Sequence, residues 1–555
     1  MGLSLMGLPA PVKRSMSLVS PGKLTVAALV IAVLAYLPSL HYPFISDDLV
    51  YVIRNPRLSG LQFANLWHLL VEPYNDFSEF LPVRDLSYWF DLKLHGLNPA
   101  WYRLHNILLY LLCLPLVYFN TSAIWRYFRP ADPASASWVA AIVTLLFTLH
   151  PAHVEAVVWI SGRKDVLACL FSLLALWLAL KAQREPSLAV RYAVAALVCM
   201  LAAILSKATA VAMAPVIALL WLFFWIDNPA HARRTSGLFW PLASLLVAGM
   251  AAAVFTAGSM VKDEIYLGSE TVTRMFAIVG GLARLSISPE SRHFYYPVFE
   301  DTYLEFRIAI GIVILFFAAG SLVFAWRKRS LAGFALTVFS LLCMPYAQLI
   351  PFDTDSLISD RFICLAVWPA MLLVVAAIWR LRPLLRIILL SLFALVWGMQ
   401  TVQRVNDWRS YETLIDADLR TYPGYYMPAV YKITSYLLPQ GRYADAEKIA
   451  AGIKSPEFRD IMIKLVRVDQ VVHSGHGSPE GLQQGDVLLK ELENGISLAP
   501  VQTGWNPSMK NLWIKLPSLL AAERIALNAQ YARMGKGSES GKPREGEIRK
   551  SGKAL

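Results

Sequence analysis

Residues 149–171 read LHPAHVEAVVWISGRKDVLACLF, a short polar stretch between two apolar runs. Six titratable side chains crowd into it: His150, His153, Glu155, Arg163, Lys164 and Asp165. Charges beside apolar helices are costly in hydrocarbon unless they are solvated or paired, and they often mark substrate pathways. The pattern therefore predicts two membrane-spanning helices joined by a polar loop that lines a cavity.

Apolar runs continue on both sides of this stretch and predict a helical membrane protein. A run of about 17–21 residues crosses roughly 30 Å of hydrocarbon as a helix. Composition agrees, since 56% of the 555 residues are hydrophobic, 16% are charged and the mean hydropathy is +0.48. We therefore expect an α-helical polytopic membrane protein with about eleven transmembrane helices. The runs lie at residues 23–40, 104–125, 136–149, 166–181, 190–206, 209–226, 237–257, 307–325, 331–350, 362–379 and 385–402.

Two apolar segments admit another interpretation. The run at 23–40 follows Lys13, Arg14 and Lys23 and holds VLA near its end, as a cleaved signal peptide does. We favour a membrane helix, because the loop after it carries an acidic motif that would lose its anchor. Residues 274–288 are apolar but short and contain two arginines, so we expect a re-entrant or surface helix there.

Basic residues cluster in short loops on alternate sides of successive runs, and this predicts the orientation. Lys and Arg are enriched in cytoplasmic loops. The basic clusters and the N-terminus therefore belong to the cytoplasm, and the C-terminal segment belongs outside. The outer loops are then 41–103, 150–165, 258–306 and 351–361. The cytoplasmic clusters are Arg126 and Arg129; Lys181, Arg184 and Arg191; Arg233 and Arg234; Arg327, Lys328 and Arg329; Arg380, Arg382 and Arg386.

The charge and cysteine patterns exclude two further classes of protein. The formal net charge of +12 is spread over short clusters and forms no single basic stripe, so we expect no nucleic-acid partner. The five cysteines lie in or beside apolar segments without a CxxC pair, which predicts neither a disulfide framework nor a structural metal. His150, His153 and Glu155 match no standard zinc signature.

An acidic pair follows the first apolar run, in HYPFISDDLVYVIRNPRLSG at residues 41–60. Asp47 and Asp48 either stop the helix or serve a site, because carboxylates at a membrane surface are costly unless solvated, paired or used. Adjacent acids point in different directions. One could accept a proton from a substrate hydroxyl while the other holds a metal, a backbone amide or an arginine.

A third polar segment, LPVRDLSYWFDLKLHGLNPAWYRLHNILLY at 81–110, leads into the second apolar run. Its polar side chains could snorkel to the interface or line a polar cavity opposite Asp47. They are Arg84, Asp85, Asp91, Arg103, His105 and Asn106.

Composition changes sharply near residue 405, which indicates a second domain. Residues 425–453, YYMPAVYKITSYLLPQGRYADAEKIAAGI, resemble one tetratricopeptide repeat. A single repeat cannot bury its own apolar face, so helices at 459–473 and 516–534 would have to pack on it. We expect a membrane domain at 1–403, a small α-helical tetratricopeptide-like domain at 404–534 and a disordered basic tail at 535–555.

Together these motifs resemble the GT-C superfamily of membrane glycosyltransferases, within it the branch of transmembrane and tetratricopeptide-repeat O-mannosyltransferases. The block HPxHxEAVxWxSGRxDxL at 150–167 matches nearly residue for residue and is the most specific part. The other matching positions are the Asp47–Asp48 pair with Asn55, Arg84, Gly96, Asn98 and Pro99, Asn106, the Asp360–Arg361–Phe362 triplet, and Arg404, Asn406, Asp407 and Trp408.

Three features depart from the family pattern. Asp85 stands where the family has Pro, and Asp360 stands where it has Glu. The repeat region is short where animal members carry long arrays, which favours a bacterial protein. The expected location is thus a bacterial inner membrane, multi-pass, with the active site and the C-terminal domain on the periplasmic side.

The resemblance implies transfer of a single sugar from a polyprenyl-phosphate donor to an acceptor hydroxyl, with inversion at the anomeric carbon. Protein Ser or Thr is the favoured acceptor, with a glycan or a lipid as alternatives. The sequence gives no support for a cofactor or a divalent metal at this site. The expected catalytic carboxylates are Asp47, Asp48 and Glu155; the phosphate ligands are Arg361, Arg84 and Arg163; the cavity is lined by His150, His153, Asp165, Asn55 and Asn106.

Two other classes of protein fit a chain with many helices and intramembrane charges. A transporter or lipid-carrier flippase is the main alternative, although the sequence shows no inverted repeat and no Gly/Pro-broken helix pair. A scaffold that holds a partner through the outer repeat domain is the third. Assays of sugar transfer separate the three.

Cysteine accessibility tests the predicted orientation. In a background without the natural cysteines, a cysteine at Ser46 should react with an impermeant thiol reagent from outside, because residues 41–103 form an outer loop. A cysteine at Ser236, beside Arg233 and Arg234, should react only after the membrane is opened. Labelling of Ser236 but not Ser46 in intact cells would invert the topology.

Overall fold

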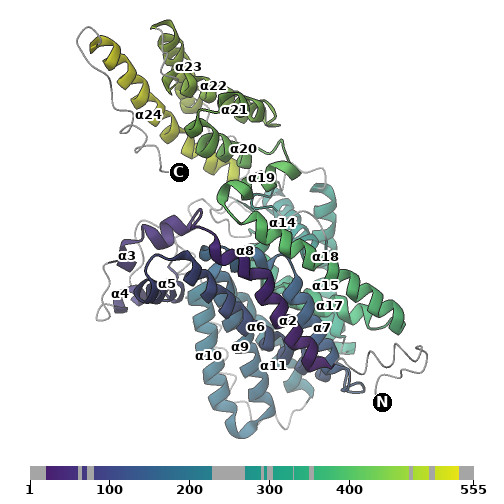
Figure 1. Cartoon of the computed structure of the whole chain (residues 1–555). Coiled ribbons are helices and arrows are strands. Elements are labelled where there is room, and N and C mark those ends of the chain that lie inside the picture. The colour runs from purple at the N-terminus through teal and green to yellow at the C-terminus, as the bar shows by residue number, and fades with distance from the viewer. Residues whose placement is uncertain are drawn as a thin grey trace. The chain divides into compact units, whose positions relative to one another are not determined.

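The computed structural model describes residues 20–59, 66–71, 80–227, 269–288, 293–296, 304–328, 330–348, 356–473, 479–498 and 507–536, and these contain helices and no strand (Figure 1). The chain divides into two compact units. The first comprises residues 1–292, 302–352 and 358–410, and the second comprises 293–301, 353–357 and 411–555.

The first unit is built from apolar helices of very different length. They are α2 (Pro21–Tyr36), α3 (Pro56–Ser59), α4 (Leu66–Val71), α5 (Pro82–His95), α6 (Pro99–Phe128), α7 (Ala136–Leu149), α8 (His153–Val158), α9 (Arg163–Arg184), α10 (Ala189–Ser206), α11 (Met213–Asp227), α14 (Ser269–Ile287), α15 (Leu304–Lys328), α16 (Leu331–Cys343), α17 (Val367–Ile378) and α18 (Pro383–Asp407).

Seven helical segments in the described part of the chain are long and apolar enough to cross a membrane. They are Pro21–His41, Pro99–Phe128, Ile160–Arg184, Pro186–Ser206, Ala208–Asp227, Leu304–Ser321 and Pro383–Asp407; the shorter apolar helices are Ala136–Leu149, Leu331–Tyr346 and Val367–Ile378. Each overlaps a predicted run, and the predicted run at 237–257 lies outside the described residues. The α-helical polytopic class is confirmed, whereas the number of crossings stays a prediction.

Helices α6, α7, α9 and α2 pack together at the centre of this unit, and α10 lies along α9. Polar side chains inside the bundle bond to backbone groups of neighbouring helices. Asn120 donates to the Leu173 carbonyl oxygen at 2.9 Å, which joins α6 to α9. Trp368 donates to Thr121 Oγ1 at 3.0 Å, which joins α17 to α6. Each bond satisfies a polar group that water cannot reach.

Helix α14, which includes the predicted re-entrant or surface helix, crosses α15 at very short range. A Cβ atom on Gly280 would lie 1.8 Å from the Arg307 carbonyl oxygen. A Cβ atom on Gly281 would lie 2.2 Å from Cδ1 of Ile358. Only glycine permits this approach of one backbone to another. The position of α14 relative to the bilayer stays a prediction.

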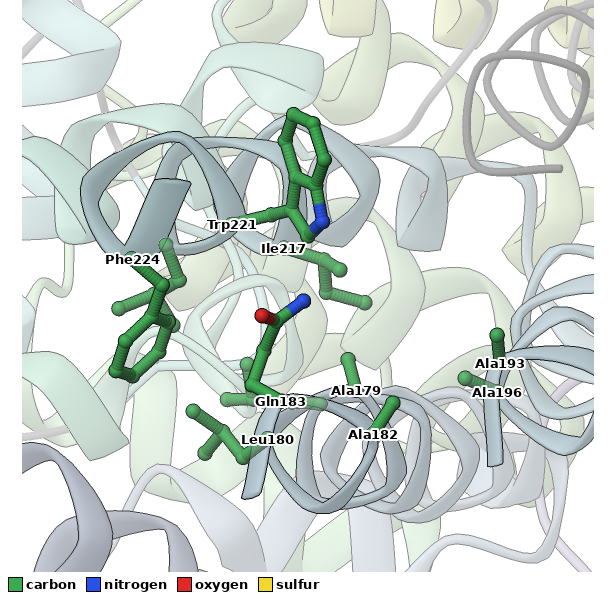
Figure 2. A pocket seen from close by; sticks show the side chains of 11 residues that line it. Ala179, Leu180, Ala182, Gln183, Ala193, Ala196, Ile217, Trp221 and Phe224 are labelled. Atoms are coloured by element: carbon green, nitrogen blue, oxygen red, sulfur yellow. The ribbon is translucent and has the colours of Figure 1, made fainter. Parts of the chain in front are cut away.

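An apolar cavity of about 20 Å³ lies between α9, α10 and α11, with the amide of Gln183 as its main polar group (Figure 2). Its α9 wall begins at Leu176, which is 11 residues or roughly 17 Å along the helix from Asp165. The cavity has none of the predicted site residues, so the chemistry lies elsewhere.

The second unit contains α19 (Tyr411–Thr421), α20 (Tyr426–Lys432), α21 (Tyr443–Ala451), α22 (Pro456–His473), α23 (Pro479–Leu498) and α24 (Pro507–Lys536). The turn before α21 is made by Gly441 in the left-handed conformation, with φ of 70°. From α21 to α24 each helix packs on the next. The helices expected at 459–473 and 516–534 lie in α22 and α24, and the tetratricopeptide assignment stays a prediction. The tail predicted at 535–555 lies outside the described residues, apart from the end of α24.

Asp418 on α19 binds the segment 293–296 within this second unit. Its carboxylate accepts three backbone bonds, two from Phe294 N at 2.9 and 3.1 Å and one from Tyr295 N at 2.9 Å. The side chain is 1% exposed. Tyr295 also stacks on Tyr431 with a ring-centroid separation of 5.4 Å. Residues 293–296 are thereby held within the second unit.

Replacing Asp418 tests this attachment. Asp418→Asn should destabilise the second unit by about 1–3 kcal/mol, because its amide group would face a donor N–H in a buried place. Asp416→Asn is the matched control, since Asp416 forms a half-exposed ion pair with Lys432 at 2.8 Å and surface pairs contribute about 0–1 kcal/mol. Pulse proteolysis of the purified full-length protein measures both. Equal stability of the two variants would contradict the assignment.

Candidate functional site

Arg361 lies at the centre of the densest polar cluster in the first unit. It belongs to a short 3-10 turn, Asp360–Ile363, that precedes α17. Its guanidinium forms a buried ion pair with Glu155 of α8, and its backbone N donates to Glu155 Oε2 at 3.1 Å. The Ser359 hydroxyl donates to the same carboxylate at 2.7 Å. Glu155 is fully buried and all its described contacts hold the 359–361 turn, so it orients Arg361.

Aromatic rings complete the surroundings of Arg361. Its guanidinium carbon lies 4.9 Å from the Trp159 ring centroid and 5.3 Å from that of Phe362. Burial lowers the pKa of Arg361, but the carboxylates of Glu155, Asp165 and Asp47 raise it overall. The guanidinium is 18% exposed and stays charged, which makes it a fixed cation facing an opening in the protein.

Lys207 supplies a second cation, at the junction of α10 and the 3-10 turn Ala208–Ala212. Its ammonium forms an ion pair with Asp165 at the start of α9. The ammonium nitrogen also lies 5.1 Å from the ring centroid of Tyr346 and 5.3 Å from that of Phe362. Burial lowers the pKa of Lys207, while Asp165 and Tyr346 raise it overall, so the group is charged at neutral pH.

These two cations line one cavity of about 30 Å³. Its polar walls come from α9, from the α10–α11 junction and from the turn before α17. They are Asp165, Lys207, Thr209, Tyr346 and Arg361. Tyr346 comes from the 3-10 turn Met344–Tyr346 after α16. Segments far apart in the sequence thus meet at one place, and two of these residues, Asp165 and Arg361, lie in predicted outer loops. Of the predicted phosphate ligands and cavity residues, Arg361 and Asp165 line it.

Asp47 and Asp48 have different surroundings, as adjacent acids are expected to have. Asp48 is fully buried and accepts bonds from Ser161 N at 2.8 Å, Ser161 Oγ at 2.6 Å and Ile45 N at 3.1 Å. Burial raises its pKa to about 6, against the effect of these bonds and of Arg103. Asp48 is therefore ionised at neutral pH, and it fastens its loop to the turn before α9.

Asp47 is half-buried and lies within electrostatic range of Arg361, whose pKa it raises. The residue before it, Ser46, has φ of 50°. A non-glycine residue in this region is uncommon and marks local strain.

Arg163 and Asn106 form buried hydrogen bonds next to α8 and are not among the residues that line the cavity. Arg163 is 1% exposed, pairs with Asp91 at 2.6 Å and donates to Asn106 Oδ1 at 2.7 Å. Asn106 in turn donates to the carbonyl oxygens of Val157 and Trp159. These bonds fix the backbone at the C-terminal end of α8. The role predicted for Arg163 as a phosphate ligand stays a prediction.

The remaining predicted residues lie in separate contacts. Arg84 donates to Asp85 Oδ1 at 2.9 Å and stacks 4.4 Å from the Tyr51 ring centroid. Asn55 accepts a bond from the Arg57 backbone N at 3.1 Å at the start of α3. Both histidines are fully buried in helix contacts. His150 Nε2 lies 3.1 Å from the Ser286 carbonyl oxygen, and His153 Nδ1 lies 3.5 Å from Cys364 Sγ.

Lys207 and Tyr346 were missed by the sequence analysis. A signal existed for Lys207, because it is the one charge between the apolar runs 190–206 and 209–226 and such residues are rare inside membrane segments. Tyr346 gave no signal, since a tyrosine near a helix end is common at membrane interfaces.

Part of this chain is similar in sequence to several known proteins. No family model matches the chain. Protein O-mannosyl-transferase F38B6.6 of Caenorhabditis elegans is 30% identical over 161 residues, which cover 27% of this chain and 22% of that protein. Protein O-mannosyl-transferase TMTC1 of Mus musculus is 33% identical over 150 residues, covering 26% of this chain and 15% of that protein.

Among solved structures, the oligosaccharyltransferase of Archaeoglobus fulgidus tethered with an acceptor peptide aligns with 75% of this chain and 58% of its own. Sequence identity is 14% and the TM-score is 0.43, below the level that establishes a common fold. The curated relatives match over about a fifth of their own length or less. Over that part, this chain resembles the protein O-mannosyl-transferases, as its motifs predicted.

Proposed function

We propose that this protein is a membrane glycosyltransferase that moves a single sugar from a polyprenyl-phosphate carrier to an acceptor hydroxyl at the outer face of the membrane. The observation that carries the proposal is the cavity in which Arg361 and Lys207 lie beside Asp165, with Asp47 in electrostatic range. The relatives' names, protein O-mannosyl-transferases, support the same class of reaction.

The two cations suit the leaving phosphate. Breaking the bond between the anomeric carbon and the phosphate oxygen leaves positive charge on the sugar and negative charge on the phosphate. Preset cations stabilise that developing charge, and loss of one such stabiliser costs a factor of roughly 100–1,000 in rate. Arg361 is held in place by Glu155 and by stacking on Trp159, so little reorganisation is needed when the phosphate arrives.

Asp47 is a better candidate than Asp48 for the base that takes the proton of the acceptor hydroxyl. All the described bonds of Asp48 are to Ser161 and Ile45 inside the protein. Asp47 is half-buried and within electrostatic range of Arg361. In the proposed step the Asp47 carboxylate takes the hydroxyl proton, the acceptor oxygen attacks the anomeric carbon, and the polyprenyl phosphate leaves with the bonding electrons. A single displacement of this kind inverts the anomeric centre.

The acceptor we favour is a Ser or Thr hydroxyl of a protein, with a glycan or lipid as alternatives. The helices of the second unit support a peptide acceptor, because stacked helical hairpins present extended surfaces that bind peptides. We place the protein in a bacterial inner membrane with the site and the second unit on the periplasmic side. The positive-inside pattern supports this orientation.

A transporter or flippase for the lipid carrier is the alternative function, since the same cations bind a carrier phosphate without any bond being broken. Reconstituted protein supplied with a polyprenyl-phosphate sugar and acceptor peptides separates the two. Mass spectrometry of the peptides should show the mass of one sugar added. Movement of the carrier across the bilayer without sugar on any acceptor would support the alternative.

The two aspartates should respond differently to the same substitution. Asp47→Asn should lower kcat by a factor of roughly 100 or more, as expected for a general base, with thermal unfolding unchanged. Asp48→Asn should also lower the unfolding temperature, because its amide N–H₂ meets donors in a buried place at a cost of about 1–3 kcal/mol. Near-normal turnover of Asp47→Asn would move the base to another carboxylate, with Glu155 the next candidate.

Arg361→Lys tests the phosphate contact. A lysine cannot reproduce a bidentate guanidinium contact, and loss of one charge-assisted bond of about 1.5–3 kcal/mol corresponds to roughly a 10-fold or greater loss. The loss should appear in kcat and in the donor KM, while the acceptor KM barely changes. Arg386→Lys is the matched control, because Arg386 also stacks on a ring, 4.2 Å from the Trp379 centroid, but lies at the start of α18. Similar kinetics for the two variants would remove Arg361 from the site.

A further inference from the structure

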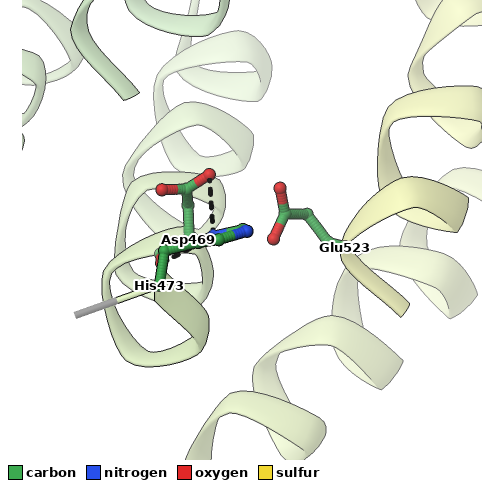
Figure 3. Close-up of side chains that lie close together, drawn as sticks. All are labelled: Asp469, His473 and Glu523. Carbon is green, nitrogen blue, oxygen red and sulfur yellow. Dashed lines mark hydrogen bonds and ion pairs between the residues drawn. The ribbon is translucent and has the colours of Figure 1, made fainter. Parts of the chain in front are cut away.

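Three metal-ligating side chains meet between two helices of the second unit. Asp469 and His473 lie one turn apart on α22, and Glu523 faces them from α24 (Figure 3). One ligand atom from each lies within 4.8 Å of the others. The imidazole is oriented by its own helix, since His473 Nδ1 lies 3.5 Å from Asp469 Oδ2 and 3.3 Å from the Asp469 carbonyl oxygen.

Asp469 is buried, Glu523 is half-buried, and both carboxylates are incompletely bonded. Asp469 is 7% exposed, and neither its Oδ1 nor Glu523 Oε2 has a hydrogen-bond partner among the described residues. Two acids so placed repel each other when ionised, so the site requires a cation or a proton.

The nearest arginine does not supply that cation. Arg524 follows Glu523 on α24, but its guanidinium binds Glu493 at 2.6 and 3.0 Å and pairs with Asp486, both on α23. Its charge is already balanced by those two acids. Among the described residues, the positive partner of Asp469 and Glu523 is therefore His473, which is 36% exposed.

We propose that Asp469, His473 and Glu523 bind one divalent transition-metal ion, of the Zn²⁺ type, that joins α24 to α22. An imidazole with carboxylates suits such an ion, whereas Mg²⁺ and Ca²⁺ prefer oxygen ligands alone. Three protein ligands leave a coordination position for water. This site is independent of the proposed transferase chemistry.

Contacts between α22 and α24 already hold the three side chains near one another. Gln530 of α24 donates to the Val472 carbonyl oxygen of α22 at 2.8 Å, next to His473. Leu527 and Val472 are buried between the same helices. Ligand atoms around tetrahedral Zn²⁺, with bonds of about 2.0–2.1 Å, lie roughly 3.4 Å apart. In the structure the ligand atoms lie within 4.8 Å of one another. Rotation of the long Glu523 side chain would bring its carboxylate to the shorter distance.

Metal titration of the full-length protein tests the proposal. The protein is purified through a tag without histidine, stripped with a chelator and titrated with Zn²⁺ by calorimetry, with elemental analysis after dialysis. We expect one Zn²⁺ per chain and a rise in the unfolding temperature on binding. Asp469→Asn, His473→Gln and Glu523→Gln should each weaken binding at least 10-fold, and a 10-fold excess of Mg²⁺ should not displace Zn²⁺.

Asp460→Asn is the matched control. Asp460 lies on the same helix with its side chain 65% exposed, and the substitution removes the same charge. It should leave the affinity for Zn²⁺ within about 2-fold, because charges at the surface are largely screened. Equal loss in the control and the three variants would overturn the proposal, as would the absence of stoichiometric Zn²⁺. A wild-type protein that binds no Zn²⁺ but gains stability from Glu523→Gln would show that the trio shares a proton instead.

Discussion

The buried ion pair between Glu155 and Arg361 joins residues 206 positions apart in the chain and is the contact on which the candidate site depends. Removing one partner of such a pair leaves an uncompensated buried charge, at a cost of about 3–5 kcal/mol. Here the carboxylate is also bonded by the Ser359 hydroxyl and the Arg361 backbone. The turn before α17 can therefore take only a position that satisfies Glu155, and this fixes where the guanidinium points.

Charged side chains from other segments hold the segment that carries Glu155. Arg103 of α6 donates to the Val158 carbonyl oxygen at 2.9 Å and also binds the carbonyl oxygens of Tyr42 and Pro43. Asp48 bonds to Ser161 on the other side. Buried polar groups need partners in a medium that lacks water. Satisfying them ties the loop after α2, the start of α6 and the ends of α8 into one rigid frame.

The residues of this frame could be identified from the sequence, but the role of each one could not. Hydropathy predicted the apolar helices because length and composition decide whether a segment crosses a bilayer. Charge density pointed to Glu155 and Arg163, and the family resemblance pointed to Arg361, yet Arg163 turns toward Asp91 and Asn106 while Arg361 faces a cavity. Which of several arginines is enclosed depends on contacts between distant segments. The absence of a zinc signature likewise gave no hint of Asp469, His473 and Glu523, because the third ligand comes from another helix.

The crossing of α14 and α15 has a consequence for how this protein tolerates change. Gly281 touches the side chain of Ile358, three residues before Arg361. Any larger side chain at that glycine would push on Ile358 and hence on the turn that holds the guanidinium. In a random mutagenesis screen, substitutions of this glycine would then lower activity as substitutions of a catalytic residue do, although it lies in an ordinary apolar helix. Tolerance at Gly281 is set by its clearance from the Ile358 side chain, and proximity to a substrate has no part in it.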